Sequence, residues 1–398
     1  MAETELKKEL QTVVKKIVED DDYGFETTIE AIKILSSLAD FKIKKPLLGE
    51  FMGDIVALAS TQTYSRPHMK KWLKECNITW PQSQKELYQG VDGKAGTEVD
   101  PIYLNSLLGL MTSSSDSDRK RAAKELRRLT KNSKSYRAAI CEFKDAIPRL
   151  LSPLSETKTE SDPDPDLCED LITTVFNASL HANNKKQLAE NPAVIPLLIE
   201  YTMLGTIETR RNAAATLGSL SALDSNKFII GDSGAVAPLI ELLRGGHPSA
   251  IRDAASTIYT LCKVRANNAK FVEQGAVEVV LEKINDGILV DELLVILAML
   301  STNRTAIDEL GDCKTLQSLL RIIRHSSSEC SKENCVAILY NVCSKDLTLL
   351  MVIRGEEIKK QTLAKLADTG TTRARRKAIS IILKIHKAFP ALSIGKYF

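Results

Sequence analysis

The sequence predicts an all-α fold in which similar groups of helices repeat along the chain and stack into a solenoid. The block Arg210–Ser221, RRNAAATLGSLS, is followed after a short polar break by FIIGDSGAVAPLIELLRGG at 228–246. Asn-Lys at 184–185 returns at 226–227, and Asn-Ala at 268–269 comes 42 residues later. Aromatic residues make up only 5% of the 398 residues, which suits packing of helix on helix. A period near 42 residues with two apolar-periodic segments is typical of a helical solenoid, which presents an extended binding surface.

The array is predicted to span residues 102–398, with about six copies and a carboxy-terminal cap. Each copy reads as a short helix followed by two longer ones. Gly234 and Gly275 allow the sharp turn after the short helix, because positive φ costs glycine little. The acidic stretch at 155–166 is predicted to be a surface loop, and RARRKAISIILKIHKAF at 373–389 a terminal cap. The last buried position of the third helix recurs at intervals of 49, 42, 42, 38 and 42 residues: Leu129, Ala178, Leu220, Cys262, Leu300 and Val342.

The residues before the array fall into two parts. Residues 1–42 are predicted to form a helical hairpin with an acidic hinge between its helices. Residues 43–100 break the helical pattern, because 54–59 is short and strand-like, 66–76 is a helix, and the Gly-rich stretch 89–101 reads as a linker. The sequence therefore predicts a small α+β module between an amino-terminal hairpin and the array.

Composition narrows the classes of partner and compartment. Lys plus Arg number 54 and Asp plus Glu 51, and this balance offers no argument for a nucleic-acid or membrane partner. No apolar run reaches the roughly 18 residues of a membrane span, and the charged start MAETELKKEL is not signal-like. Eight cysteines without a CxxC pair read as buried free thiols in a reducing compartment. The expected location is cytoplasmic, and also nuclear if RARRK at 373–377 is a localisation signal rather than the basic face of the cap.

The repeat block at 208–246 resembles the armadillo repeats of plant U-box/armadillo proteins. The segment IKKPLLGEFMGDIVALASTQTYSRPHMKKWL at 43–73, followed by TWPQSQKEL at 79–87, resembles the U-box pattern FxCPISLELMxDPVxxxxGQTYxRxxIxxWL and TCPxTQxxL. This resemblance covers nearly the whole chain and implies a right-handed armadillo superhelix behind a U-box-like module. The matching U-box positions are Pro46, Glu50, Met52, Asp54, Val56, Gln62, Thr63, Tyr64, Arg66, Trp72, Leu73, Thr79, Pro81, Gln84 and Leu87.

The U-box-like segment also departs from the family pattern. In the family, an apolar groove on this module docks a ubiquitin-conjugating enzyme. Gly49 stands where the family has an apolar contact residue, Ile55 replaces a proline, and Thr61 replaces a turn glycine. Lys45 and Trp80 stand where cysteines are often found. Loss of one apolar contact costs roughly 1–3 kcal/mol, so the module reads as a degenerate U-box.

By this resemblance, Leu47, Trp72 and Pro81 are candidates for docking the conjugating enzyme, although each could instead complete a small core. U-boxes bind no zinc, and His68 and Cys76 have no partners at metal-ligand spacing, so neither a metal nor a cofactor is expected. Such a ligase has no nucleophile of its own, because it holds the charged conjugating enzyme in a reactive geometry. No catalytic residue is therefore assigned.

In armadillo solenoids the third helix of each repeat lines the groove. Nuclear-import adaptors carry a Trp and, four residues later, an Asn on this face, and the equivalent pairs here contain no Trp, so a general import role is not expected. Basic residues on these helices, among them Arg127, Arg210 and Arg211, either bind an acidic or phosphorylated partner or form a solvated face. The groove-lining candidates are Lys124, Arg128, Asn177, Ser219, Leu261, Met299 and Asn341.

Two functions follow from the resemblance. In the first, the repeats bind a protein substrate and the U-box recruits a ubiquitin-conjugating enzyme for ubiquitin transfer. In the second, the U-box has lost that docking and the chain is a non-catalytic armadillo scaffold or decoy. Both imply protein partners, with no nucleic acid and no membrane insertion.

Overall fold

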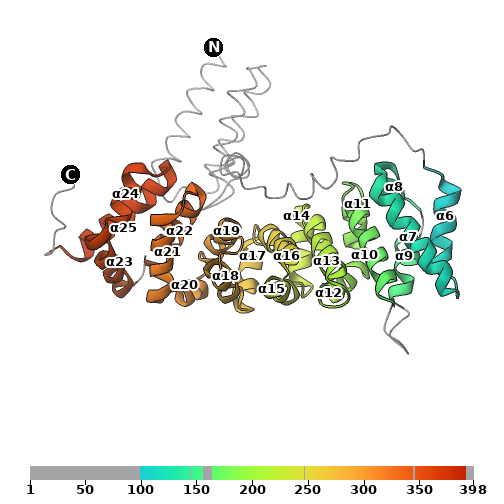
Figure 1. Ribbon diagram of the computed structural model, residues 1–398, viewed down its shortest axis with the longest axis horizontal. Helices are drawn as coiled ribbons and strands as arrows, with labels where there is room; N and C mark the ends of the chain where they lie inside the picture. Colours follow the sequence, from blue (N-terminus) through green and yellow to red (C-terminus); the bar gives the residue numbers. More distant parts are fainter. Residues whose placement is uncertain (1–98, 144, 156–163, 246, 344–345, 391–398) are drawn as a thin grey trace, which may run out of the picture. The chain divides into compact units, whose positions relative to one another are not determined.

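The chain divides into two units, Met1–Trp80 and Pro81–Phe398, and all residues that the computed structural model describes belong to the second. These residues are helical and contain no strand (Figure 1). The predicted hairpin and nearly all of the U-box-like module lie outside the described residues, so those two predictions stay untested. The described ranges are 99–143, 145–155, 164–245, 247–343 and 346–390.

The described helices repeat in the order first, second and third, and the third helix of each group is the longest. The predicted short first helix is found except in the last group, where α23 has 14 residues and α24 has 8, and in the group of α14 and α15, which have nine residues each. The first helices are α8 (Lys134–Ala139), α11 (Asn184–Glu190), α14 (Asp224–Asp232), α17 (Arg265–Glu273), α20 (Arg304–Leu310) and α23 (Leu347–Lys360). The second helices are α6 (Pro101–Leu110), α9 (Ala146–Ser155), α12 (Val194–Met203), α15 (Val236–Arg244), α18 (Ala276–Asn285), α21 (Cys313–His325) and α24 (Thr362–Thr369). The third helices are α7 (Asp116–Asn132), α10 (Pro165–Ser179), α13 (Ile207–Leu220), α16 (Pro248–Leu261), α19 (Val290–Leu300), α22 (Glu329–Cys343) and α25 (Thr372–Ala388).

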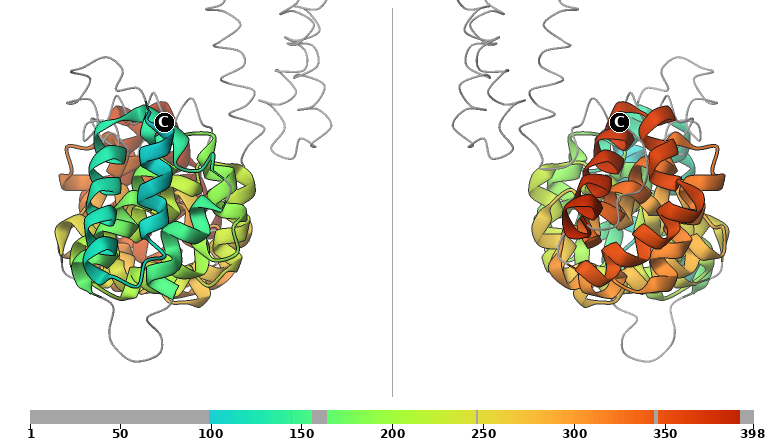
Figure 2. Two further views of the ribbon diagram at one scale, coloured as in Figure 1. Left: turned by 90° about the vertical axis from the view of Figure 1, so that its right-hand side faces the viewer. Right: turned by 90° about the vertical axis from the view of Figure 1, so that its left-hand side faces the viewer.

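The third helices form the spine of the array. Each packs against the next, from α7 through to α25, and the two end-on views in Figure 2 place α6 and α7 at one end and α25 at the other. Small residues allow this close approach, since Ala213 and Ala214 of α13 are fully buried. The all-α prediction is confirmed for the described residues. The segment at 373–389, predicted to be a terminal cap, is mainly α25, the third helix of a last repeat whose first and second helices are α23 and α24.

Local signals explain where the helices begin. Ser115 and Thr206 cap α7 and α13, because their hydroxyl oxygens accept hydrogen bonds from the backbone N–H groups of Asp118 and Thr209. The predicted glycine turns are confirmed, since Gly234 and Gly275 have φ values of 88° and 79°.

Among the described helices, none is both long enough and apolar enough to cross a membrane.

A ladder of buried asparagines ties each repeat to the one before it. Asn184, Asn226 and Asn267 occupy equivalent places in α11, α14 and α17. Each donates from Nδ2 to a carbonyl at the end of the preceding third helix, and also to a carbonyl of the preceding first helix. The acceptors at the third helices are Ala178 (3.1 Å), Leu220 (3.0 Å) and Leu261 (3.0 Å). Those at the first helices are Arg137 (2.5 Å), Lys185 (3.3 Å) and Lys227 (3.0 Å).

This ladder corrects the predicted alignment of the fourth copy by one residue. Helix α16 ends at Leu261 with Cys262 as its C-cap, just as α13 ends at Leu220 with Ser221 as its C-cap. Leu261 is therefore the equivalent of Leu220, and the intervals on either side of it become 41 and 39 residues. For the same reason the third ladder residue is Asn267 and not Asn268.

Candidate functional site

The groove candidates differ sharply in exposure. Lys124 and Arg128 are exposed on α7, and Met299 and Asn341 are partly exposed on α19 and α22. The other three are buried: Asn177 is 2%, Ser219 3% and Leu261 0% exposed.

Two separate reasons explain the buried candidates. Leu261 is assigned to the groove because the predicted alignment of the fourth copy is shifted by one residue. With the corrected alignment the groove positions on α16 are Ser256 and Thr260, which are both partly exposed. Asn177 is in register, but its Nδ2 donates to the Thr130 hydroxyl at 3.2 Å. Ser219 is also in register and donates to the Ser179 carbonyl at 2.9 Å. In the middle of the array these polar groups hold neighbouring repeats together and leave little surface for a partner.

A hollow of about 760 Å³ lies where α6 meets α7, and it includes both exposed candidates. We call it the amino-terminal pocket. Helix α6 supplies apolar and aromatic side chains, and α7 supplies cations. Its lining residues are Tyr103, Ser106, Leu107, Leu110, Arg121, Lys124, Glu125, Arg127, Arg128, Lys131, Asn132 and Asp170.

Several charges of this pocket are already paired. Glu125 accepts from the Nε and Nη2 atoms of Arg128, both at 2.7 Å, and from the Tyr103 hydroxyl at 3.2 Å. The hydrogen bonds from Arg128 hold the pKa of Glu125 below its usual value. Arg127 pairs with Asp170 of the next third helix at 2.7 Å. These contacts position the walls of the pocket and leave less charge for a ligand.

Two cations of the pocket remain available. Lys124 and Lys131 make no ion pair with any described residue, and both are exposed on α7. They lie seven residues apart, so they share one face of the helix. An apolar wall beside two unpaired ammonium groups suits an acidic segment that also carries an apolar side chain.

The basic residues predicted at 210 and 211 serve the array itself. Arg210 donates from Nε to the Thr202 carbonyl at 3.2 Å. Arg211 pairs with Asp253 of the next third helix at 2.9 Å and with Glu208 at 3.0 Å. For these two residues the structure favours a packing role over partner binding.

Lys185 is another basic residue whose side chain forms its hydrogen bonds within the array. Its Nζ donates to the carbonyl of Ser179 at 2.6 Å, and to the carbonyl and hydroxyl of Ser219 at 3.0 and 2.6 Å. Burial lowers its pKa to about 8. Lys227, one repeat later, pairs with Asp224, whereas Lys185 has no acidic partner among the described residues.

Other chemistry is scarce in the described residues. They contain no group of three His, Cys, Asp or Glu side chains placed to bind a metal ion. Burial raises the pKa of the Cys262 and Cys335 thiols, which makes them poor nucleophiles. Cys313 is exposed and Cys141 partly so, unlike the buried thiols that the sequence predicts. The three docking candidates, Leu47, Trp72 and Pro81, lie outside the described residues.

Sequence reasoning missed several residues of the amino-terminal pocket. The spacing of Lys131 from Lys124 and Arg128 could have placed it on the same face of α7. Tyr103, Leu107 and Leu110 carry no such signal, because only the packing of α6 against α7 brings them to the pocket.

Comparison with known proteins agrees with this architecture. The profile of the plant U-box protein ARM repeat region matches residues 105–287. U-box domain-containing protein 9 of Arabidopsis thaliana is 40% identical, and the alignment covers 96% of this chain and 95% of that protein. Putative U-box domain-containing protein 46 of the same plant is 36% identical, with coverage of 95% and 94%. This chain belongs to the plant U-box/armadillo-repeat protein family.

Solved structures support the fold alone. An engineered protein of 18% identity aligns with a TM-score of 0.58 over 94% of this chain and 88% of its own. A computationally designed armadillo repeat protein for modular peptide recognition aligns with a TM-score of 0.52 at 18% identity, over 60% of this chain and 99% of its own. The armadillo interpretation of the repeats is therefore confirmed.

Proposed function

We propose that this chain brings a protein substrate to a ubiquitin-conjugating enzyme, with the repeats as the recognition surface and residues 43–100 as the docking module. The amino-terminal pocket carries the recognition half of the proposal. Its unpaired Lys124 and Lys131 stand beside apolar Leu107 and Leu110, whereas the candidates Asn177 and Ser219 of the next two third helices are buried. Membership of the U-box family supports the docking half, in which Leu47, Trp72 and Pro81 would contact the enzyme.

Ubiquitin transfer is tested with purified components. The full chain is incubated with ubiquitin, the activating enzyme and a panel of conjugating enzymes, alongside an active U-box relative. Chain formation that is lost in Leu47→Ala would support the proposal. Absence of chains with every conjugating enzyme, while the relative is active, would sink the ligase function.

The recognition half is tested separately with a fluorescent peptide that contains alternating glutamate and leucine. Lys124→Glu with Lys131→Glu should weaken binding roughly tenfold or more, because two attractive contacts become repulsive. Arg304→Glu with Lys314→Glu, which changes the same charge at exposed sites on α20 and α21, is the matched control. Equal losses in the two double variants would reject the pocket as the recognition site.

The alternative is a non-catalytic scaffold that binds partners through the same repeats. The departures at Lys45, Gly49, Ile55 and Thr61 favour it, since they fall in the segment that should dock the enzyme. Gly49→Leu distinguishes the two functions. Recovery of conjugating-enzyme binding only in this variant would support the scaffold, whereas strong binding by the unmodified chain would exclude it.

A further inference from the structure

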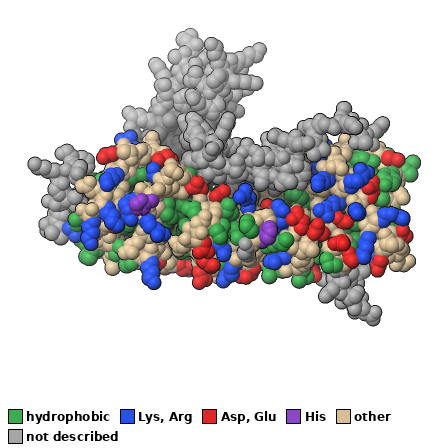
Figure 3. All heavy atoms as spheres, viewed as in Figure 1, with side chains coloured by type: hydrophobic (Ala, Val, Ile, Leu, Met, Phe, Trp, Pro, Cys, Tyr) green, Lys and Arg blue, Asp and Glu red, His purple; other side chains and the backbone are tan. Residues whose placement is uncertain are grey.

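A second basic hollow lies at the other end of the array, between the carboxy-terminal ends of α21 and α23 and the start of α24. We call it the carboxy-terminal cationic pocket. It has a volume of about 670 Å³, and Figure 3 shows Lys and Arg side chains gathered over this end of the array. It is lined by Arg324, His325, Lys359, Lys360, Gln361 and Lys365, with no apolar residue.

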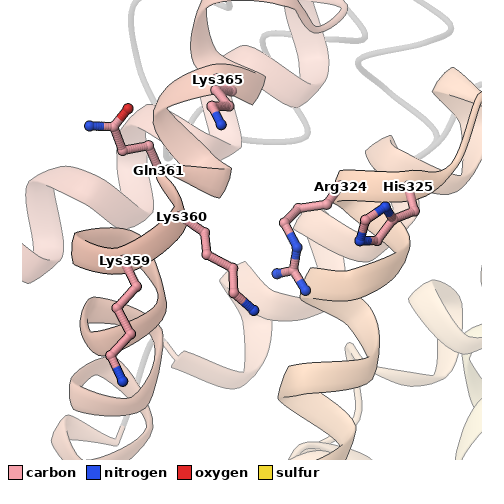
Figure 4. A pocket seen from close by; sticks show the side chains of 6 residues that line it. All are labelled: Arg324, His325, Lys359, Lys360, Gln361 and Lys365. Carbon is pink, nitrogen blue, oxygen red and sulfur yellow. The ribbon is translucent and has the colours of Figure 1, made fainter.

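Cations from three helices line this hollow. In Figure 4, Arg324 and Lys360 extend toward one another from α21 and α23, and Lys365 lies on α24, apart from both. Glu356 is the acid that meets them, pairing with Arg324 and, at 3.5 Å, with Lys360. Lys365 makes no ion pair with a described residue. One carboxylate therefore pairs with two of these three cations, and the net charge of the four side chains stays positive.

Helix-terminus stabilisation accounts for only part of this arrangement. Cations in the last turns of α21 and α23 offset the partial negative charge of those helix ends, which explains Arg324 and Lys360. It does not explain Lys365, which lies in the middle of α24. Gln361 adopts the left-handed conformation, with φ of 55°, at the junction of α23 and α24, and this turn brings Lys365 of α24 to the same hollow as Lys360 of α23.

The backbone N–H groups at the start of α24 already have hydrogen-bond acceptors within the protein. The buried carboxylate of Glu357 accepts hydrogen bonds from the backbone N–H groups of Leu363 at 2.7 Å and Ala364 at 2.8 Å. The unused capacity of this pocket is therefore the positive charge of its side chains.

We propose that the carboxy-terminal cationic pocket binds the phosphate of a phosphorylated serine or threonine in a partner protein. A phosphate near neutral pH carries about −1.5 to −2 charge and three acceptor oxygens, which suit a hollow lined by Arg324, Lys360 and Lys365. The hollow is larger than one phosphate group and accommodates the adjoining peptide. A membrane fits less well, because the lining offers no apolar side chain for insertion. This proposal stands apart from ubiquitin transfer.

The test uses the full chain and a fluorescein-labelled peptide, made with phosphoserine, serine or glutamate at its centre and read by anisotropy. The phosphopeptide should bind at least roughly tenfold more tightly than the other two, since charge-assisted bonds to a dianion are the strongest of the three. Inorganic phosphate should displace it at high concentration.

Lys360→Glu with Lys365→Glu should abolish that preference, and the exposure of both side chains makes loss of folding unexpected. Arg304→Glu with Lys314→Glu is again the matched control, and thermal melts verify the fold of both. Equal binding of the serine or glutamate peptide, or equal losses in the two double variants, would overturn the proposal. So would pocket-dependent binding to phosphatidylcholine vesicles that contain phosphatidylinositol bisphosphate together with no preference for the phosphopeptide.

Discussion

Asn184 illustrates how single residues hold successive repeats together. It is buried, and its Nδ2 spans from the end of α10 to α8 of the preceding repeat. A buried amide that satisfies two carbonyls is costly to remove, because each abandoned acceptor loses its partner without regaining water. The repeated Asn motif thus marks the scaffold of the array rather than its binding site.

Asn184→Ala should lower the free energy of unfolding by about 1–3 kcal/mol. Asn183→Ala is the control, because Asn183 is exposed and its side chain caps no helix. Urea denaturation followed by circular dichroism measures both variants. Equal midpoints for the two would contradict the ladder.

Lys185 gives the protein a specific pH dependence. Its pKa of about 8 in the folded chain lies below the ordinary 10.5, so between these values the unfolded chain holds a proton that the folded chain has released. Stability from this group therefore rises as the pH increases from about 8 to 10.5, by at most about 3 kcal/mol.

The difference in unfolding free energy between the wild type and Lys185→Met should accordingly grow in favour of the wild type from pH 7 to pH 10. Lys186→Met, at the exposed neighbour, should show no such trend. Denaturant titrations across this range measure the effect. A difference that stays constant would show that the folded-state pKa of Lys185 is unshifted.

At the scale of elements, a glycine inside a helix can allow two helices to pack closely, because it has no side chain. Gly231 lies inside α14, and a Cβ atom there would be 2.0 Å from Oδ1 of Asn267. Glycine therefore allows α14 and α17 to approach closely enough for the asparagine ladder. Gly355 inside α23 serves no such purpose, because a Cβ atom at that position would point into open space.

The two glycines should respond to alanine with opposite signs. Gly355→Ala should stabilise the chain by roughly 0.5–1 kcal/mol, because alanine favours the helix. Gly231→Ala should destabilise it, since Asn267 must move and lose its hydrogen bonds, at a cost of about 1–3 kcal/mol. Thermal unfolding of both variants measures this, and a gain in stability for Gly231→Ala would refute the packing argument.

At the scale of the whole molecule, stability depends on unbroken stacking of repeats. Helix α22 is buried along most of its length, including Cys335, Val336, Ile338 and Leu339, and α25 packs against it. In a linear array each repeat contacts only its neighbours, so a terminal repeat must cover the last apolar face.

A chain that ends at Cys343 should therefore associate, because it lacks α23, α24 and α25. Size-exclusion chromatography with light scattering compares it with a chain that ends at Pro390 and keeps α25. The shorter chain should form larger species than the longer one. Identical, monodisperse behaviour of both chains would argue against a capping role for the last repeat.

The sequence alone identified the repeat, the order of its helices and the family, because each depends on local patterns. Period, apolar spacing and glycine turns are properties of neighbouring residues, and Gly234 and Gly275 took the predicted conformations. The same patterns left a one-residue ambiguity in α16. Adjacent asparagines at 267 and 268 fit the repeat equally well, and Leu261 and Cys262 are both apolar.

Only the tertiary structure decided that register and the surfaces that remain for partners. Asn267 is fixed by its hydrogen bonds to α14 and to the end of α16, which no local pattern contains. Arg211 forms an ion pair because the neighbouring third helix α16 offers Asp253. Lys124 has no such acid within reach among the described residues, so its charge is available to a ligand. Charge on a helix is a property of the sequence, but its availability to a ligand is a property of the packed array.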